Sequence, residues 1–402
     1  MTTDQMQLVK ATVPVLREHG VSLTTHFYNR MFTHNPELKH MFNMGNQQNS
    51  KQQTALAMAV LAYAEHIENP AALMPAVDHI GQKHTSLDIR PEHYAIVGRH
   101  LIASIAEVLG EAASPQLLEA WTLAYQQLAA IMSGHEQKIY DEQIAKQGGW
   151  TGWRPFIVKE KVRESAEITS FYLYPADGGD VASYLPGQYI SLRLFLPELN
   201  LMQPRQYSIS CSPNGRYYRI SVKREAGSQH PDGMISNRLH DHIQEGAIVE
   251  LTAPAGSFVL NKQSRSHKVF ISGGVGQTPL LSMLEDIAGD PAAQQLPVTW
   301  IHGCRSERVH AFKDKVAAIG QHYRNLNQHI FYEDAPLQHK NHYQGQVELE
   351  LLKNEILNQE TDYYICGAAP FISKHYRFLV ANGIQQDAIH FEEFGPSSLQ
   401  LQ

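Results

Sequence analysis

A glycine-rich run at residues 273–279 is the first segment whose residue types and spacing indicate a chemistry. The run reads Gly-Gly-Val-Gly-Gln-Thr-Pro and follows an apolar, strand-like segment, Lys268–Ser272. Glycines let the backbone approach a ligand closely, and we expect Thr278 to cap the next helix with Pro279 at its first position. The positive end of that helix would face an anion. The spacing is GGxG rather than the usual GxGxxG of dinucleotide-binding folds, so a plain strand-to-helix turn is the alternative.

A second group of suitable side chains ends a β-type run at residues 205–208. Arg205 suits a pyrophosphate, Tyr207 can lie against a flat ring, and Ser208 can hydrogen-bond to a ring nitrogen. An ordinary strand with one exposed arginine explains these four residues equally well. Further along, residues 233–236 (Gly-Met-Ile-Ser) open a predicted helix at 237–242, where free backbone N–H groups could hold phosphate.

His84 is the histidine, among 22, whose position suggests metal ligation. It extends the apolar stripe of Val77 and Ile80 by one helical turn, just before a helix break at 88–91. An imidazole on the inward face of a helix near its end suits the axial ligand of a haem. A lone histidine there is more often a core or capping residue, so its neighbours decide the assignment.

Three successive patterns must position these residues, and they predict a multidomain protein. Residues 1–147 show apolar side chains at helical spacing, as in Leu23, Phe27 and Met31, which predicts an all-α domain. Residues 148–262 begin at Gly148-Gly149 and contain short β-type runs between turn signals, which predicts an antiparallel β-barrel. Residues 263–402 alternate strand and helix, which predicts an α/β domain with a parallel sheet.

Composition limits the class of protein. The 402-residue chain is 43% hydrophobic and 18% charged, with a net charge of −7 and no block of like charges, so we expect no nucleic-acid partner. The longest apolar stretch, 55–64, is too short to span a membrane, and the N-terminus does not resemble a signal peptide. The three cysteines are far apart, which argues against disulfides, a zinc site or an iron–sulfur cluster and favours the cytoplasm.

Residues 152–402 resemble the ferredoxin–NADP reductase family, in which these motifs occur in the same order. The resemblance implies that an FAD contacts a set of side chains and one helix start: Tyr189, Arg205, Gln206, Tyr207, Ser208, Met234, Ile235 and Ser236. It implies that NADH or NADPH contacts the glycine-rich loop and a later strand end: Gly273, Gly274, Val275, Gly276, Gln277, Thr278, Cys366 and Gly367. The C-terminal Phe391-Glu392-Glu393-Phe394 matches a family tail whose aromatic ring, here Phe394, covers the flavin.

A flavin that accepts hydride must pass electrons onward, and many relatives use a cysteine-ligated cluster that this chain cannot build. The helical N-terminal domain is therefore the expected acceptor, which requires a haem. Its sequence resembles the globin part of bacterial flavohaemoglobins. The matching segments are Thr25–Phe32, Asn35–Leu38, Phe42–Met44, Gln82–Ser86, Pro91–Tyr94, Ile96–Gly98 and Ala120–Tyr125. With the reductase part, the resemblance covers essentially the whole chain.

The resemblance implies the roles of the haem-side residues. His84 would be the proximal ligand of a haem b, and Tyr94 and Glu136 would orient its imidazole. Tyr28 and Gln52 would stabilise bound oxygen on the distal side, where Leu56 lines the pocket and Phe42 packs against the porphyrin. A carboxylate behind the ligand would push electron density to the iron, as oxygen-activating haems require. Without the resemblance, core packing for Tyr28 and a solvated helix end for Glu136 would be the simpler interpretations.

The implied activity is nitric oxide dioxygenase: NAD(P)H reduces FAD, FAD reduces the haem iron, and the oxygen-bound ferrous haem converts nitric oxide to nitrate. One alternative is a haem-based sensor or store of oxygen or nitric oxide with a self-reducing flavin module. Another is a general diaphorase. We expect a cytoplasmic monomer, and a lipid in the haem pocket is left open. Arg305-Ser306 could accommodate a 2′-phosphate, but no acidic residue in the sequence decides between NADH and NADPH.

Overall fold

The computed structural model describes residues 1–48, 50–226, 233–334, 341–357 and 360–394. The chain forms two compact units. The first contains residues 1–146, 150–153 and 193–205, and the second contains residues 147–149, 154–192 and 206–402.

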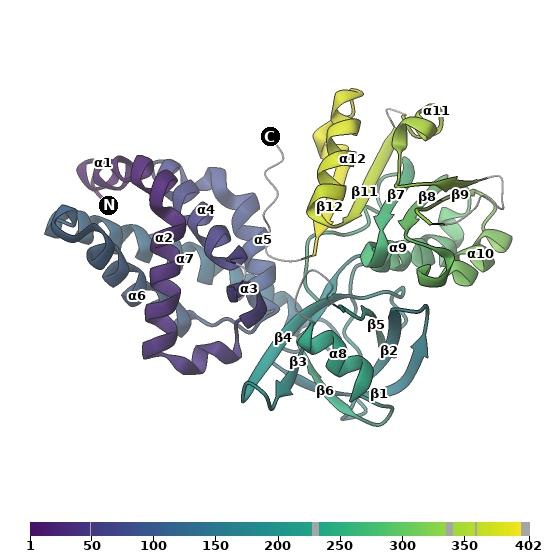
Figure 1. Cartoon of the computed structure of the whole chain (residues 1–402), viewed down its shortest axis with the longest axis horizontal. Coiled ribbons are helices and arrows are strands. Elements are labelled where there is room, and N and C mark those ends of the chain that lie inside the picture. Colours follow the sequence, from purple (N-terminus) through teal and green to yellow (C-terminus); the bar gives the residue numbers. More distant parts are fainter. Residues whose placement is uncertain (49, 227–232, 335–340, 358–359, 395–402) are drawn as a thin grey trace. The chain divides into compact units, whose positions relative to one another are not determined.

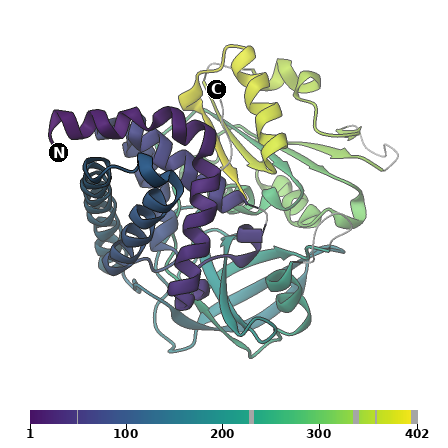
Figure 2. The same cartoon turned by 60° about the vertical axis from the view of Figure 1, so that its left-hand side comes forward.

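The N-terminal segment is helical throughout its described part, as the apolar spacing predicts (Figures 1 and 2). Its α-helices are α1 (Thr3–Ala11), α2 (Val13–His34), α3 (Met44–Gln48), α4 (Lys51–Glu65), α5 (Met74–Thr85), α6 (Pro91–Leu109) and α7 (Pro115–Ala145). Pro91 begins α6 and Pro36 begins a short 3-10 helix, the first helical position that suits proline. Leu23, Phe27 and Met31 are buried in one core with residues of α4, α6 and α7. No described helix has both the length and the apolar character needed to cross a bilayer.

A closed antiparallel sheet follows. Its strands are β1 (Arg154–Arg163), β2 (Ile168–Pro175), β3 (Tyr189–Leu196), β4 (Leu201–Ser208), β5 (Tyr218–Lys223) and β6 (Ile248–Leu251). The strand order is β4-β3-β6-β1-β2-β5, and the pairings of β1 with β2 and β6 and of β2 with β5 are antiparallel. A bridge between Ile209, just after β4, and Ile220 of β5 joins the two edges. The predicted barrel is therefore present. Its closure removes the exposed strand edges that an open sheet would have.

The C-terminal segment is a parallel sheet covered by helices on both faces. Its strands are β7 (His267–Gly273), β8 (Val298–Cys304), β9 (Leu326–Tyr332), β10 (His342–Gln344), β11 (Thr361–Gly367) and β12 (Ile389–Glu393). Its helices are α9 (Gln277–Gly289), α10 (Lys313–His322), α11 (Lys353–Ile356) and α12 (Ala369–Ala381), labelled in Figure 1. Alternate residues of β7 face opposite sides: Phe270 packs in the core with α9 and α10, whereas Val269 and Ile271 pack in the core with α11 and α12.

The order of this sheet, β10-β9-β8-β7-β11-β12, places the first strand of the segment at its centre. The chain continues from β7 to β8 on one side and later returns to β11 on the other. The strand order therefore reverses between β7 and β11. In open α/β sheets, ligands bind at such a switch point, outside the carboxyl ends of the strands.

Candidate functional site

His84, in the last turn of α5, lies in a hydrogen-bonded group with two residues from other helices. Its Nδ1 atom is 2.7 Å from Oε1 of Glu136 on α7 and 3.0 Å from the hydroxyl of Tyr94 on α6. The Tyr94 hydroxyl donates to the same carboxylate oxygen at 2.5 Å. Glu136 is 2% exposed, so it is not the solvated helix end that the sequence alone would favour. The structure brings together the three residues predicted for the proximal side.

This arrangement fixes which ring nitrogen of His84 carries the proton. An ionised carboxylate only accepts hydrogen bonds, so the Nδ1 atom facing Glu136 is the N–H donor. The Nε2 atom then keeps its lone pair, through which it can bind a metal. The His84 side chain is 33% exposed, in contrast to its buried partner Glu136. These features fit the axial ligand of a haem.

Tyr94 is itself held in place by Tyr125. The Tyr125 hydroxyl donates to the Tyr94 carbonyl at 2.7 Å, and the Tyr125 ring lies against Gly98, where an added Cβ atom would be only 2.4 Å from the ring. Burial, followed by the adjacent Glu136 carboxylate, raises the pKa of Tyr94 well above its usual range, so Tyr94 remains a neutral donor. The supporting role of Tyr125 was not predicted, because the contact joins residues of two different helices that are 31 positions apart in sequence.

The residues predicted for the distal side also come together. Tyr28 on α2 is 6% exposed, hydrogen-bonds to the Gln52 side chain, and has its pKa raised by burial. The rings of Tyr28 and Phe42 make an edge contact with centroids 5.9 Å apart, and Leu56 packs against the same core. Gln52 also accepts a hydrogen bond from Gln47 at 2.8 Å, which orients its amide.

A haem fits the ligands that this unit offers. Among the described residues, no group of three or more histidine, cysteine or acidic side chains could form a metal site by itself. An iron held mainly by a porphyrin needs only one protein ligand, and His84 supplies the required lone pair. Tyr28 supplies a buried neutral hydroxyl from another helix of the same unit.

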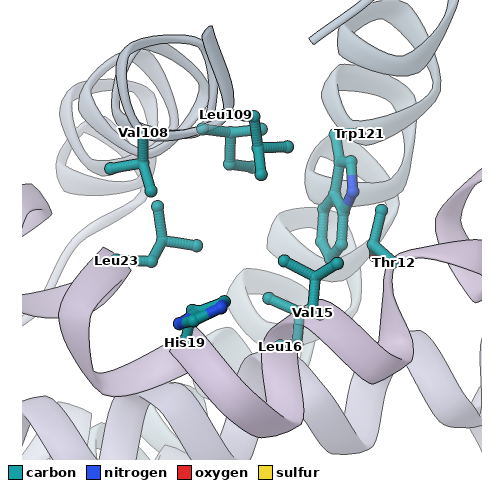
Figure 3. Close-up of a pocket in the computed structure, with 9 residues that line it drawn as sticks. Thr12, Val15, Leu16, His19, Leu23, Val108, Leu109 and Trp121 are labelled. Atoms are coloured by element: carbon teal, nitrogen blue, oxygen red, sulfur yellow. The ribbon is translucent and has the colours of Figure 1, made fainter. Parts of the chain in front are cut away.

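The small cavity shown in Figure 3 is separate from these residues. It has a volume of about 30 Å³ and is lined mainly by apolar side chains of α2, α6 and α7, including Leu16, Leu23, Leu109 and Trp121. None of the residues predicted for the proximal or distal side lines it. It therefore takes no part in the candidate site.

The residues predicted to hold a flavin lie on adjacent barrel strands. Tyr189 begins β3, and its ring covers Gly256, where a Cβ atom would be 2.8 Å from the ring. Arg205, Gln206, Tyr207 and Ser208 are the last four residues of β4, the neighbouring strand. Arg205 donates from Nη1 to the Pro204 carbonyl at 2.7 Å. Ser208 is 9% exposed.

The predicted phosphate-binding helix starts three residues earlier than expected. Helix α8 (Met234–Asp241) has Gly233 as its N-cap, so Met234, Ile235 and Ser236 form its first turn rather than a preceding loop. The Ser236 hydroxyl donates to the Gly233 carbonyl at 3.0 Å and closes this turn. The first N–H groups of a helix have no partner within it. The backbone N–H groups predicted to hold phosphate therefore lie at the helix terminus itself.

At the switch point, the glycine-rich loop meets the end of β11. A Cβ atom on Gly276 would lie 2.2 Å from the Cys366 carbonyl oxygen and 3.0 Å from the Gly367 nitrogen. Only glycine allows this approach. The Gln277 side chain is 1% exposed, and neither its oxygen nor its nitrogen has a hydrogen-bond partner in the described structure. A buried, unpaired amide beside a loop that faces the switch point fits a site for a polar ligand such as a nucleotide.

The predicted capping role of Thr278 is wrong. Helix α9 begins at Gln277, with Gly276 as its N-cap, and the Thr278 hydroxyl donates back to the Val275 carbonyl at 3.0 Å. A short 3-10 turn at residues 274–276 starts the helical geometry earlier than the prediction assumed. The helix N-terminus still follows the glycine-rich loop, so the expected direction of the helix dipole is unchanged.

Phe371, in the first turn of α12, was not predicted as part of this site. Cβ atoms added to Gly273 and Gly367 would lie 3.1 Å and 2.9 Å from its ring, so the ring covers both glycines.

Glu392 on β12 pairs with Cys366 on β11. The pKa of the Cys366 thiol is raised well above its usual range, first by burial and then by the Glu392 carboxylate. Phe394 is 41% exposed at the end of the described chain, and its role over a flavin stays a prediction.

Comparison with known proteins agrees with this arrangement. The globin family model matches residues 25–132, and the oxidoreductase NAD-binding domain model matches residues 270–376. The flavohemoproteins of Bordetella parapertussis and Rhizobium meliloti are 49% and 46% identical to the chain, over 96% and 98% of it and 97% and 98% of their own lengths.

Solved structures show the same likeness. The flavohemoglobin of Malassezia yamatoensis, solved with bound FAD and heme, covers 98% of this chain and 99% of its own, with a TM-score of 0.86 at 24% identity. The FAD/NAD-binding domain of a nitric oxide dioxygenase from Vibrio cholerae is 38% identical, with a TM-score of 0.55, and covers 60% of this chain and 99% of its own. A globin domain and an FAD- and NAD-type reductase module are therefore joined in one chain, which belongs to the flavohemoprotein family.

Proposed function

We propose that this chain is an NAD(P)H-dependent nitric oxide dioxygenase that holds haem b and FAD and converts nitric oxide to nitrate. The observation that carries the proposal is the buried Glu136 carboxylate, 2.7 Å from the Nδ1 atom of His84. An oxygen carrier does not need an anionic partner behind its ligand, whereas an oxygen-activating haem uses one.

The relatives support the cofactors and the reaction. The curated relatives are named flavohemoproteins, the Malassezia yamatoensis structure contains FAD and heme, and the Vibrio cholerae relative is named a nitric oxide dioxygenase. We assign residues 1–147 to the haem domain, 148–262 to the FAD domain and 263–402 to the nicotinamide nucleotide domain.

When bound, the nicotinamide nucleotide, the flavin and the haem supply the hydride, the single-electron transfer and the reaction of oxygen with nitric oxide. The residues of the chain itself bind, orient and polarise these groups. On the proximal side, Glu136 keeps the proton of His84 on Nδ1 and gives the imidazole anionic character. Tyr94 donates to the same carboxylate and holds it in position.

On the distal side, Tyr28 supplies the hydrogen-bond donor. Its hydroxyl is buried and its pKa is raised, so it stays protonated at any pH the protein experiences. A neutral donor placed where negative charge develops on oxygen stabilises that charge. Gln52 hydrogen-bonds to Tyr28 and orients the hydroxyl.

In the reductase half, the chain positions a nucleotide and a flavin. The approach of Gly276 to Cys366 forms the floor of the nucleotide site, and the Phe371 ring packs over Gly273 and Gly367 from the α12 side. Tyr189 and Tyr207 offer flat rings for the flavin, and the first turn of α8 offers N–H groups for its pyrophosphate.

The test uses the purified full-length protein with its cofactors. An absorption spectrum should show a haem Soret band with a flavin shoulder. When nitric oxide is added to aerobic protein with NADH, both should be consumed rapidly and nitrate should accumulate. Slow consumption would favour the sensor or store. The variant His84→Ala should lose nitrate formation and keep flavin reduction by NADH; continued nitrate formation by this variant would refute the proposed role of His84.

A further inference from the structure

The segment after β8 lies beside the candidate nucleotide site and carries a cation. Strand β8 pairs in parallel with β7, with Gly303 opposite Gly273 of the glycine-rich loop. Arg305 is the second residue after Gly303, at the carboxyl end of the sheet. In dinucleotide-binding α/β sheets, the end of the strand beside the phosphate loop reaches the adenosine ribose: an acidic residue there binds the 2′-hydroxyl, and an arginine accommodates a 2′-phosphate.

Arg305 forms an ion pair with Glu167, a residue 138 positions earlier in the sequence. Glu167 belongs to the connection between β1 and β2 of the barrel, and its side chain is 19% exposed, whereas that of Arg305 is 62% exposed. The cation that the sequence offers for a 2′-phosphate is thus already paired with a carboxylate.

The backbone holds Glu167 at this position. Its carbonyl accepts a hydrogen bond from the Arg224 nitrogen at 2.7 Å, which fixes it to the end of β5. The preceding residue, Ala166, donates to the Arg308 carbonyl at 3.1 Å, which fixes the same turn to the segment after β8. The carboxylate is therefore a preorganised part of this surface, because one backbone hydrogen bond at Glu167 and one at the preceding residue set its place.

A second carboxylate adds to the negative charge at the end of β8. The pKa of the Cys304 thiol is raised to about 12 by burial, then by Glu167, and also by Glu333, while Arg305 opposes these effects. The Glu333 nitrogen donates to the Cys304 carbonyl at 3.2 Å, which places this residue beside the same strand end. One arginine is therefore accompanied by two acids.

We propose that Glu167 is a specificity-determining residue that neutralises Arg305 and makes this chain select NADH over NADPH. This inference rests on the proposed nicotinamide-dependent reductase and deepens it. A ribose 2′-hydroxyl can donate to the Glu167 carboxylate. A 2′-phosphate has no proton to donate to it, carries about two negative charges, and must separate Arg305 from its partner before it can bind.

The test measures binding without catalysis. Isothermal titration calorimetry on the full-length protein with its cofactors compares ADP-ribose with 2′-phospho-ADP-ribose. The wild-type protein should bind ADP-ribose at least about tenfold more tightly, and Glu167→Gln, which removes the charge but keeps the size, should reduce this preference by about tenfold. Glu164→Gln, in the same turn, is the matched control and should keep the wild-type ratio. The double variant Glu167→Gln/Arg305→Gln should lose the gain in affinity for 2′-phospho-ADP-ribose that Glu167→Gln alone brings.

Reduction of ferricyanide then compares kcat/KM for NADH and NADPH, and needs neither haem chemistry nor nitric oxide. The ratio of these values should follow the binding ratio in each variant. Tighter binding of the 2′-phospho ligand by the wild-type protein would overturn the inference even if every variant failed to fold. An unchanged ratio in a folded Glu167→Gln protein would overturn it as well. If the ratio shifts while nitric oxide is not consumed, the specificity inference stands and the dioxygenase proposal fails.

Discussion

The Oε1 atom of Glu136 lies 2.7 Å from the Nδ1 atom of His84, although the two residues are 52 positions apart. A carboxylate that is 2% exposed is costly to bury unless donors satisfy it. Here the imidazole N–H and the Tyr94 hydroxyl both donate to the same oxygen. The carboxylate therefore depends on its two donors, and the donors are oriented by the carboxylate.

Replacing Glu136 by Gln should reduce nitric oxide consumption about tenfold, because the amide keeps a hydrogen-bond acceptor but loses the negative charge behind His84. The measurement is the rate of nitric oxide loss with NADH in air. Reduction of ferricyanide should be unaffected. Glu142→Gln, an exposed acid further along α7, serves as control. Wild-type nitric oxide consumption by the Glu136 variant would show that the charge has no catalytic role.

Replacing Tyr28 by Phe should speed oxygen dissociation from the reduced protein by about 10- to 100-fold, the effect expected from losing one hydrogen bond to a charged group. Stopped-flow spectroscopy measures this rate. Tyr63→Phe removes a buried hydroxyl that donates to the Ala124 carbonyl at 2.9 Å in the same core, so it should change stability and leave the rate as it is. Equal effects of both substitutions would indicate a general loss of packing.

Replacing Gly276 by Ala should raise the KM for NADH about tenfold and destabilise the protein by about 2 kcal/mol, because the new methyl group would overlap the Cys366 carbonyl. The assays are ferricyanide reduction and thermal unfolding. Gly289→Ala lies at the other end of α9, where an added Cβ atom meets nothing within 4 Å. This control should keep the wild-type KM and Tm or raise the Tm slightly.

Acidification should destabilise the nucleotide-binding segment through His310. Burial, with a smaller effect of Lys313, lowers the pKa of His310 to about 4. The unfolded chain therefore binds a proton below about pH 6.5 that the folded chain does not bind until about pH 4, so the free energy of unfolding falls as the pH falls. This residue alone should cost about 2 kcal/mol between pH 7 and pH 5.

Calorimetric melting of the full-length protein at both pH values tests this contribution. His310→Gln, which can still accept from the Tyr332 hydroxyl that lies 2.7 Å from the His310 ring nitrogen, should lose less Tm on acidification than the wild-type protein. The exposed His19→Gln should behave as the wild type does. Identical losses in all three proteins would rule out His310 as a source of the pH dependence.

Local patterns predicted most of the elements because each depends on neighbouring residues. The strand-like segment at 268–272 is β7 (His267–Gly273). The glycines at 148–149 lie between the end of α7 at Ala145 and the start of β1 at Arg154. The predicted limits of helix α8 and the predicted cap of α9 were wrong, since a single turn at a helix start depends on backbone geometry that residue type only weakly specifies.

The sequence by itself determined the classes of the three segments and, through its resemblance to a family, the residues to test. Periodicity and turn residues act over a few positions, so they can be read along the chain. Only the tertiary structure decided which atoms meet: Glu136 with His84, Tyr125 with Tyr94, Phe371 with two glycines, and Glu167 with Arg305. These pairs come from different elements, and their energies depend on burial and on angles that exist only after packing. The acidic residue that the sequence did not supply for Arg305 lies across the fold, 138 positions away.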